Sequence, residues 1–132
     1  MALSGTDLIG QARTGTGKTL AFGSSLLHRL QTSADESEEP ITHGCPRALV
    51  ITPTRELALQ VARDLELAGS RLHARVLTIY GGTGYDDQLA ALKKGIDVAV
   101  GTPGRLLDLA NRRALDLSRI EVLVLDEADE ML

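Results

Sequence analysis

The chain has 132 residues, a length typical of one domain. Hydrophobic residues make up 43%, enough for a core, and a net charge of −4 argues against a protein that binds nucleic acid through an overall basic surface. No apolar run approaches membrane-spanning length, no basic-plus-apolar signal segment opens the chain, and Cys45 is the single cysteine. These features predict a cytoplasmic protein with no membrane association and no internal disulfide.

Apolar runs alternate with helical segments along the chain, which predicts an α/β fold with a parallel sheet covered by helices on both faces. We expect strands at 7–11, 48–52, 75–80, 97–101 and 121–125. We expect helices near 18–31, 55–68, 85–94, 104–111 and from 127 onward. In the second helix, Leu57, Val61, Leu65 and Ala68 are spaced for a buried face. The acidic segment 35–40 predicts a surface loop.

A segment after the first predicted strand has the composition of a phosphate-binding loop. It consists of Ala12, Arg13, Thr14, Gly15, Thr16, Gly17, Lys18 and Thr19. Its glycines let several backbone N–H groups meet one anion, Lys18 can reach the outer phosphates, and the Thr19 hydroxyl can ligate magnesium. The match to G-x-x-x-x-G-K-[ST] is loose, because the first glycine of that pattern falls at Ala12. A chance glycine turn before a helix is the alternative.

The last predicted strand ends directly in Asp126, Glu127, Ala128 and Asp129. A buried strand that delivers a carboxylate at its C-terminal end is the usual way in which phosphate-loop enzymes hold Mg²⁺, which favours Asp126 as a ligand. The next carboxylate, Glu127, can orient or deprotonate a water molecule. The alternative is an acidic helix start on a solvated face, and the upstream glycine-rich segment favours the nucleotide site.

Two further segments repeat one design, namely a strand, then Thr-Pro, then an arginine. The first contains Thr52, Pro53, Thr54 and Arg55, and the second contains Thr102, Pro103, Gly104 and Arg105. Each predicts a threonine cap with proline at the first helical position. Plain capping is the alternative to an anion site, but arginine is unusual in a first turn, where acidic residues are preferred. Two such helix starts on one sheet edge suit a polyanion such as a phosphate backbone.

Together these segments resemble the first RecA-like domain of a DEAD-box RNA helicase. The matching stretches are 12–19, 53–58, Gly81-Gly82, 102–105 and 126–129, in the family's order. The resemblance implies a phosphate-loop NTPase fold, with residues 1–132 forming part of the domain, truncated at both ends. It implies ATP and Mg²⁺ as ligands. Lys18, Asp126 and Glu127 would be catalytic, and Thr19 and Asp126 would hold the metal.

The resemblance also implies RNA contacts through the phosphate backbone without sequence preference. The residues carried over are Pro53, Thr54, Arg55, Gly81, Gly82, Thr102, Pro103, Gly104 and Arg105. Asp129 would link the acidic segment to the family's Ser-Ala-Thr segment, whose strand lies in the sheet beside the one that carries Leu125. Without that strand, we expect an exposed sheet edge.

The family's second RecA-like domain, which supplies arginine fingers, lies outside these 132 residues. Since such an arginine is worth about 10³–10⁵ in rate, we expect the chain alone to hydrolyse ATP negligibly. With its net charge of −4 and an aromatic content of 2%, we also expect weak RNA binding without base stacking.

Two other functions stay open at this point. One is a phosphate-loop ATPase that acts on DNA or on protein, although Pro-Thr-Arg-Glu-Leu-Ala with Asp-Glu-Ala-Asp favours the RNA family. The other is a non-catalytic piece that binds only nucleotide or a partner. Intact Lys18, Asp126 and Glu127 argue against a decayed enzyme.

Overall fold

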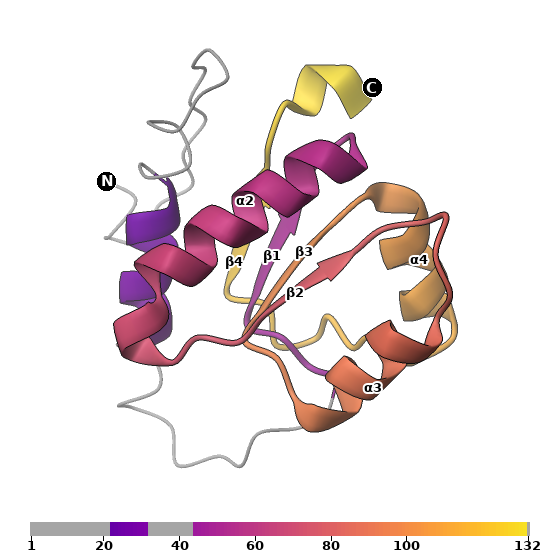
Figure 1. The fold of residues 1–132 in the computed structure, drawn as a ribbon, viewed down its shortest axis with the longest axis horizontal. Coiled ribbons are helices and arrows are strands. Elements are labelled where there is room, and N and C mark those ends of the chain that lie inside the picture. The colour runs from indigo at the N-terminus through magenta and orange to yellow at the C-terminus, as the bar shows by residue number, and fades with distance from the viewer. Residues whose placement is uncertain (1–21, 32–43, 132) are drawn as a thin grey trace.

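The computed structural model of the chain describes residues 22–31 and 44–131 (Figure 1). The expected strand 7–11, the glycine-rich segment 12–19 and the acidic segment 35–40 lie outside the described residues. The described strands are β1 (Ala48–Ile51), β2 (Val76–Ile79), β3 (Val98–Gly101) and β4 (Val122–Leu125). They form a four-stranded sheet in the order β2-β3-β1-β4.

Every strand pair in this sheet is parallel, as the alternation of strands and helices predicts. Val50 of β1 lies opposite Val100 of β3 on one side and opposite Val124 of β4 on the other. Parallel neighbours need a crossover connection, and the helices between the strands supply it. Each described strand lies within its predicted range and is one or two residues shorter.

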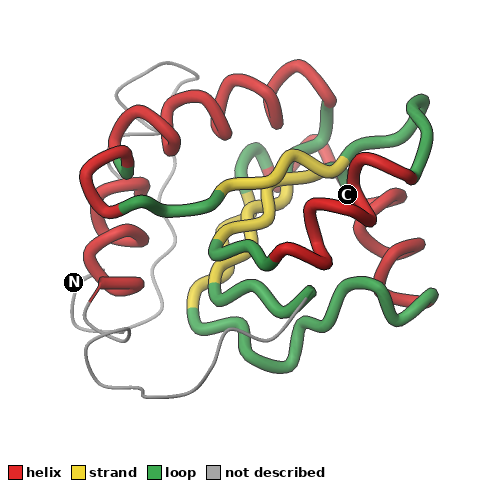
Figure 2. The backbone as a smooth tube through the Cα atoms, turned by 60° about the horizontal axis from the view of Figure 1, so that its bottom comes forward, coloured by secondary structure: helices red, strands yellow, loops and turns green. Residues whose placement is uncertain are grey.

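Helices cover both faces of the sheet (Figures 1 and 2). The described helices are 22–31, α2 (Arg55–Ala68), α3 (Asp86–Lys94) and α4 (Pro103–Asn111). A short 3-10 turn that the sequence did not predict, η2 (Ser70–Leu72), follows α2. The helix expected from 127 onward is a single 3-10 turn, η3 (Ala128–Met131). None of the helices in the described ranges is both long and apolar enough to cross a membrane.

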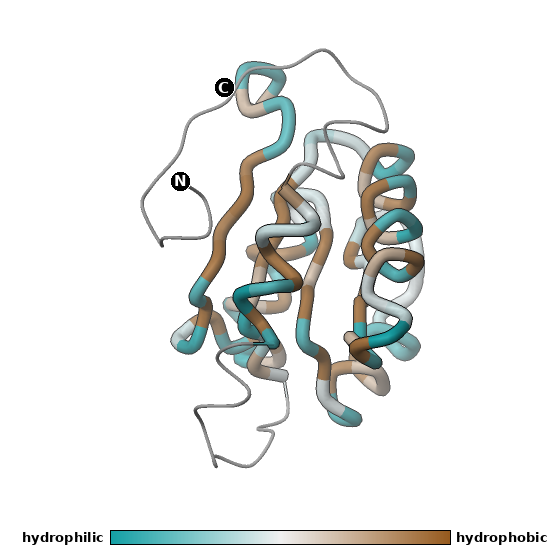
Figure 3. Tube along the Cα trace, turned by 90° about the vertical axis from the view of Figure 1, so that its left-hand side faces the viewer, coloured by the Kyte–Doolittle hydropathy of each residue, from teal (hydrophilic) through white to brown (hydrophobic). Residues whose placement is uncertain are grey.

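The core consists of two apolar layers, one on each face of the sheet. Val50 and Val100 point into the layer under α2 and the helix over residues 22–31, where Leu26 and Leu65 also lie. Leu49, which precedes Val50 in the sequence, points into the opposite layer with residues of α3 and α4. Successive strand residues alternate between faces, so a strand covered on both sides must be apolar throughout. Figure 3 shows these apolar strands between the helices.

The buried face of α2 differs from the one that the sequence predicted. The buried residues are Ala58, Val61, Ala62 and Leu65, whereas Ala68 is exposed and Leu57 is only half-buried. At about 100° per residue, Leu57 and Ala68 lie at the border of the stripe whose centre these four residues define. The expected inward position of Ala68 was therefore wrong.

The outermost strand of the described sheet, β4, presents apolar side chains to solvent. It pairs with β1 alone among the described strands, and Leu123 and Leu125 are 57% and 54% exposed. In Figure 3 this strand runs along one margin of the molecule. An apolar strand with an unpaired edge is a template for association with another chain. The exposed edge that we expect next to Leu125 stays a prediction, since the pairing of β4 is known only within the described strands.

We expect Leu123→Lys to slow aggregation of the chain while changing its folding free energy by less than about 0.5 kcal/mol, because the side chain is exposed. Light scattering during incubation at moderate temperature measures the first effect, and urea unfolding measures the second. The matched control is Leu67→Lys, which adds the same charge to an exposed position on α2, away from any strand. Equal protection by both variants would show that net charge, and not the edge of β4, controls association.

Candidate functional site

The predicted functional segments in the described part of the chain meet at one edge of the sheet. Because all strands are parallel, their C-terminal ends lie together, and each is followed by a segment of interest. These segments are 52–55 after β1, 80–85 after β2, 102–105 after β3 and 126–129 after β4. The glycine-rich segment 12–19, with Lys18 and Thr19, lies outside the described residues. The edge therefore joins the candidate RNA contacts to the candidate catalytic carboxylates.

The first Thr-Pro segment caps its helix differently from the prediction. Thr54, not Thr52, is the N-cap of α2, and its Oγ1 accepts a hydrogen bond from the Leu57 N–H at 3.2 Å. Thr52 is fully buried, and its hydroxyl donates to the Thr54 carbonyl oxygen at 3.1 Å. Pro53 consequently precedes the cap, and the expectation that it takes the first helical position was wrong. Arg55 is the first residue of α2.

The second Thr-Pro segment follows the prediction in its positions, although the Thr102 side chain makes no capping hydrogen bond. Thr102 is the N-cap of α4, and Pro103 is the first helical residue. The two segments differ because Thr54 offers a capping hydroxyl where the second segment has Gly104, so the first helix begins two residues later. Gly104 is exposed, and an added Cβ would have no neighbour within 4 Å. Nothing in the described structure therefore requires glycine there, whereas a close-approaching ligand would.

Both candidate RNA-contacting arginines lie against tyrosine rings. The guanidinium carbon of Arg55 is 4.8 Å from the centroid of the Tyr80 ring, and that of Arg105 is 4.0 Å from the centroid of Tyr85. Contacts of this kind are cation–π interactions. The tyrosines flank the loop that contains Gly81 and Gly82, and Gly82 has a φ of +84°, in the region that favours glycine. Because aromatic residues are scarce and no motif surrounds Tyr80 or Tyr85, the sequence gives no sign that these rings contact the arginines.

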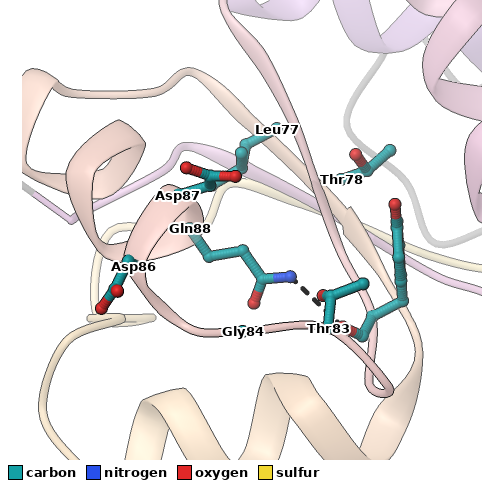
Figure 4. Close-up of a pocket in the computed structure, with 8 residues that line it drawn as sticks. Leu77, Thr78, Thr83, Gly84, Asp86, Asp87 and Gln88 are labelled. Atoms are coloured by element: carbon teal, nitrogen blue, oxygen red, sulfur yellow. Dashed lines mark hydrogen bonds between the residues drawn. The ribbon is translucent and has the colours of Figure 1, made fainter.

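A cavity of about 440 Å³ lies beside this loop (Figure 4). Its lining residues are Leu77, Thr78, Tyr80, Thr83, Gly84, Asp86, Asp87 and Gln88. The Gln88 side-chain amide donates to the Tyr80 carbonyl oxygen at 3.2 Å, which links two residues of the cavity lining. The carboxylates of Asp86 and Asp87 would repel a phosphate group, so the cavity does not suit the RNA backbone. No motif in the sequence predicts this cavity.

The acidic segment after β4 forms a tight turn. Asp126 is buried, and its backbone N–H donates to the Ile51 carbonyl oxygen at 2.9 Å, which fixes it beside the end of β1. Glu127 is half-buried and has a φ of +55°, a left-handed conformation that costs a non-glycine residue about 1–3 kcal/mol. Its carbonyl oxygen accepts from the Glu130 N–H at 3.0 Å. Asp129 is exposed in η3.

Of the two residues that the resemblance implies for Mg²⁺, Asp126 lies in the described part of the chain and Thr19 lies outside it. Mg²⁺ is ordinarily held by one or two carboxylates together with substrate phosphates, not by an all-protein cage. Asp126 supplies one buried carboxylate at the sheet edge where a nucleotide is expected. Within residues 22–31 and 44–131, His, Cys, Asp and Glu side chains form no group of three that could hold a metal ion.

The titration of Asp116 is perturbed at a place remote from this edge. Its pKa is lowered by hydrogen bonds from the side chain and the backbone of Ser118, whose N–H lies 2.9 Å from Asp116 Oδ1. The Asp116 N–H donates to the carbonyl oxygen of Gly44. Gly44 precedes β1, so this contact lies near the edge formed by the N-terminal ends of the strands, opposite the candidate site. This carboxylate stabilises a connecting loop and is not part of the candidate site.

The described architecture has helices on both faces of a parallel sheet and the candidate segments at the C-terminal strand ends, and its solved neighbours are RNA helicases whose folds are RecA-like. The model of the DEAD/DEAH box helicase family matches residues 1–132, and the chain belongs to that family. The resemblance seen in the sequence is thereby confirmed.

Two helicases and one solved structure illustrate how close the relatives are. The chain is 49% identical over 132 residues to the ATP-dependent RNA helicase CshA of Listeria monocytogenes and covers 24% of that protein. It is 48% identical over 131 residues to the ATP-dependent RNA helicase RhlB of Serratia proteamaculans and covers 30% of it. The crystal structure of a hypothetical ATP-dependent RNA helicase from Sulfolobus tokodaii superposes with a TM-score of 0.82 at 36% identity. That match covers 98% of this chain and 34% of the other. The chain thus spans about a quarter to a third of these relatives.

Proposed function

We propose that this chain is the ATP- and RNA-binding part of a cytoplasmic ATP-dependent RNA helicase. In the complete enzyme, ATP hydrolysis drives unwinding or remodelling of RNA duplexes. The observation that carries the proposal is that one sheet edge unites two arginine-bearing helix starts with the buried Asp126. This combination suits an enzyme that holds a nucleotide and a phosphate backbone at neighbouring positions.

For the nucleotide, the proposal assigns the binding of the ATP phosphates to the backbone N–H groups of residues 12–19 and to Lys18. Thr19 and Asp126 hold Mg²⁺, which when bound neutralises charge on the phosphates. Glu127 accepts a proton from the attacking water and orients it. The strained backbone at Glu127 supports this role, because such conformations cluster at functional sites.

For RNA, the proposal assigns phosphate contacts to the starts of α2 and α4 and to the loop that follows β2. Arg55 and Arg105 supply charge, while the exposed backbone at Gly82 and Gly104 allows close approach. The neighbouring residues Pro53, Thr54, Gly81, Thr102 and Pro103 complete this surface. Contacts to phosphates carry no base information, so binding is independent of sequence. Asp129, exposed beside Glu127, would couple this part to a second RecA-like domain.

The test of the proposed RNA surface is the salt dependence of binding to a fluorescent single-stranded oligouridine. We expect Arg55→Gln to lower the affinity for RNA. It should also reduce the magnitude of the slope of log K against log salt by about one, which corresponds to the loss of one phosphate contact. Fluorescence anisotropy at several salt concentrations measures both. Arg63→Gln is the matched control, because Arg63 is an exposed arginine in the middle of the same helix.

Two outcomes would contradict the proposal. If both variants behave like the wild type, the helix start at Arg55 does not contact the RNA backbone. If an oligodeoxythymidine of the same length binds and responds to Arg55→Gln in the same way, the alternative of an ATPase that acts on DNA is favoured. The affinity that we expect for RNA is low in either case, since the chain carries a net charge of −4.

A further inference from the structure

The guanidinium of Arg105 is held from several sides by the segment between β2 and α3. Its carbon lies 4.0 Å from the centroid of the Tyr85 ring. Its Nη2 donates to the Thr83 carbonyl oxygen at 2.8 Å, and its Nη1 donates to Gln88 Oε1 at 3.0 Å. Gln88 is itself buried and bonded to the Tyr80 carbonyl oxygen. These contacts connect the start of α4 to both ends of the loop that contains Gly81 and Gly82.

Tyr85 is the residue around which these contacts are arranged. It meets Arg105 and Asp108 of α4 and Arg112, the C-cap of that helix, which lie on one side because they are three and four residues apart. Its hydroxyl donates to Asp108 Oδ2, and its ring lies 4.2 Å from the guanidinium carbon of Arg112. The Arg112 Nε in turn donates to Asp108 Oδ1 at 3.2 Å. The ring is half-buried against the core layer beneath α3 and α4.

These contacts leave Arg105 both fixed and still able to donate. A guanidinium carries five N–H donors, and the bonds to Gln88 and Thr83 each use one donor, on Nη1 and Nη2 respectively. Stacking on an aromatic ring fixes the plane of the guanidinium, and a fixed group loses less conformational freedom when it binds a ligand.

We propose that Tyr85 is a positioning residue for RNA binding. It aims the Arg105 guanidinium toward the edge of the sheet and holds the loop of Gly81 and Gly82 against α4. It does so without touching RNA, because the ring faces the arginines and the core. This inference rests on the proposed function, in which Arg105 contacts an RNA phosphate.

The experiment compares Tyr85→Leu, Tyr85→Phe, Arg105→Gln and the double variant Tyr85→Leu/Arg105→Gln in the full chain. The probe is a fluorescent oligouridine, with anisotropy measured over a range of salt. We expect Tyr85→Leu to weaken binding about tenfold and to lower the salt slope by about one, because the arginine loses its stacking partner. Tyr85→Phe keeps the ring and should stay within about a factor of two of the wild type.

The double variant tests whether Tyr85 acts through Arg105. If it does, Tyr85→Leu causes no further loss once Arg105 is replaced. Further loss of the full tenfold in that background would overturn the proposal. The stabilisation of the chain by Mg²⁺ and ATP should be the same in every variant, which separates a local effect on RNA from a general loss of structure.

Arg105→Lys keeps the test decisive if Tyr85→Leu does not fold. Lysine retains the charge, but it has no planar group that could stack on Tyr85 and donate hydrogen bonds to Thr83 and Gln88 at the same time. We expect this variant to lose as much affinity as Tyr85→Leu, and wild-type affinity would overturn the proposal.

The outcomes also distinguish this inference from the proposed function. If Arg105→Gln binds oligouridine as tightly as the wild type, the assignment of Arg105 as an RNA contact fails. If Arg105→Gln weakens binding but Tyr85→Leu and Arg105→Lys do not, the contact stands and the role of Tyr85 is overturned.

Discussion

Replacement of Lys18 by alanine should abolish the stabilisation of this chain by Mg²⁺ and ATP. A ligand that binds only the folded state stabilises it by about 2.7 kcal/mol at a concentration one hundred times its dissociation constant. Without its ammonium group, position 18 cannot neutralise the outer phosphates, so we expect most of this stabilisation to disappear. Thermal melts with and without Mg²⁺ and ATP measure it.

The matched control for this experiment is Lys94→Ala. Lys94 is an exposed lysine in the last turn of α3, at the end remote from the functional edge. Lys94→Ala removes the same charge as Lys18→Ala. Because Lys94 lies far from the candidate nucleotide site, this variant should leave the response to ATP unchanged. A wild-type response from Lys18→Ala would rule out residues 12–19 as the phosphate loop. A parallel series with GTP reports whether any residue of this chain selects adenine.

Gly101→Ala should destabilise the folded chain by about 3 kcal/mol, near the upper end of the range for overpacked cores. A Cβ on Gly101 would lie 2.4 Å from the carbonyl oxygen of Ile79 on the neighbouring strand. That oxygen cannot move aside freely, because it accepts the Thr102 N–H at 3.0 Å and so fixes the cap of α4. Urea unfolding followed by circular dichroism measures the change.

Gly104→Ala is the natural comparison, since it makes the same chemical change three residues later. The added methyl group meets nothing within 4 Å, and the position lies in the first turn of α4. We expect a stability within about 0.5 kcal/mol of the wild type. If the RNA backbone approaches Gly104 closely, this variant should nevertheless bind oligouridine more weakly. Equal destabilisation by both substitutions would contradict the packing argument.

Local sequence determined the architecture of the described part of this protein. The β1 and β3 sequences are apolar at every position, which is typical of strands buried on both faces of a sheet. Parallel strands place their C-terminal ends together, so the grouping of Arg55, Arg105 and Asp126 also followed from the sequence. These predictions succeeded because they depend on periodicity and on chain direction, which are local properties.

The folded structure decided which of several possible conformations or positions particular residues take. The two Thr-Pro segments look alike in sequence, but they differ in which threonine caps the helix, because Thr54 competes with Thr52 for that role. Ala68 has suitable spacing for burial, but it lies at the border of the buried face of α2. The position of that face is set by the core layer against which α2 packs. Glu127 belongs to a predicted helix start, yet its backbone is left-handed.

The tyrosine contacts show the same division most clearly. Tyr80 and Tyr85 have no pattern around them that predicts a partner, since their arginines are far away in the chain. Folding brings each ring within 5 Å of a guanidinium, because β2 and β3 are neighbours and β1 lies next to β3. The sequence by itself predicted the residues that we propose for the phosphate chemistry. The tertiary structure decided how those residues are held, because stacking and packing are set by neighbours in space and not in sequence.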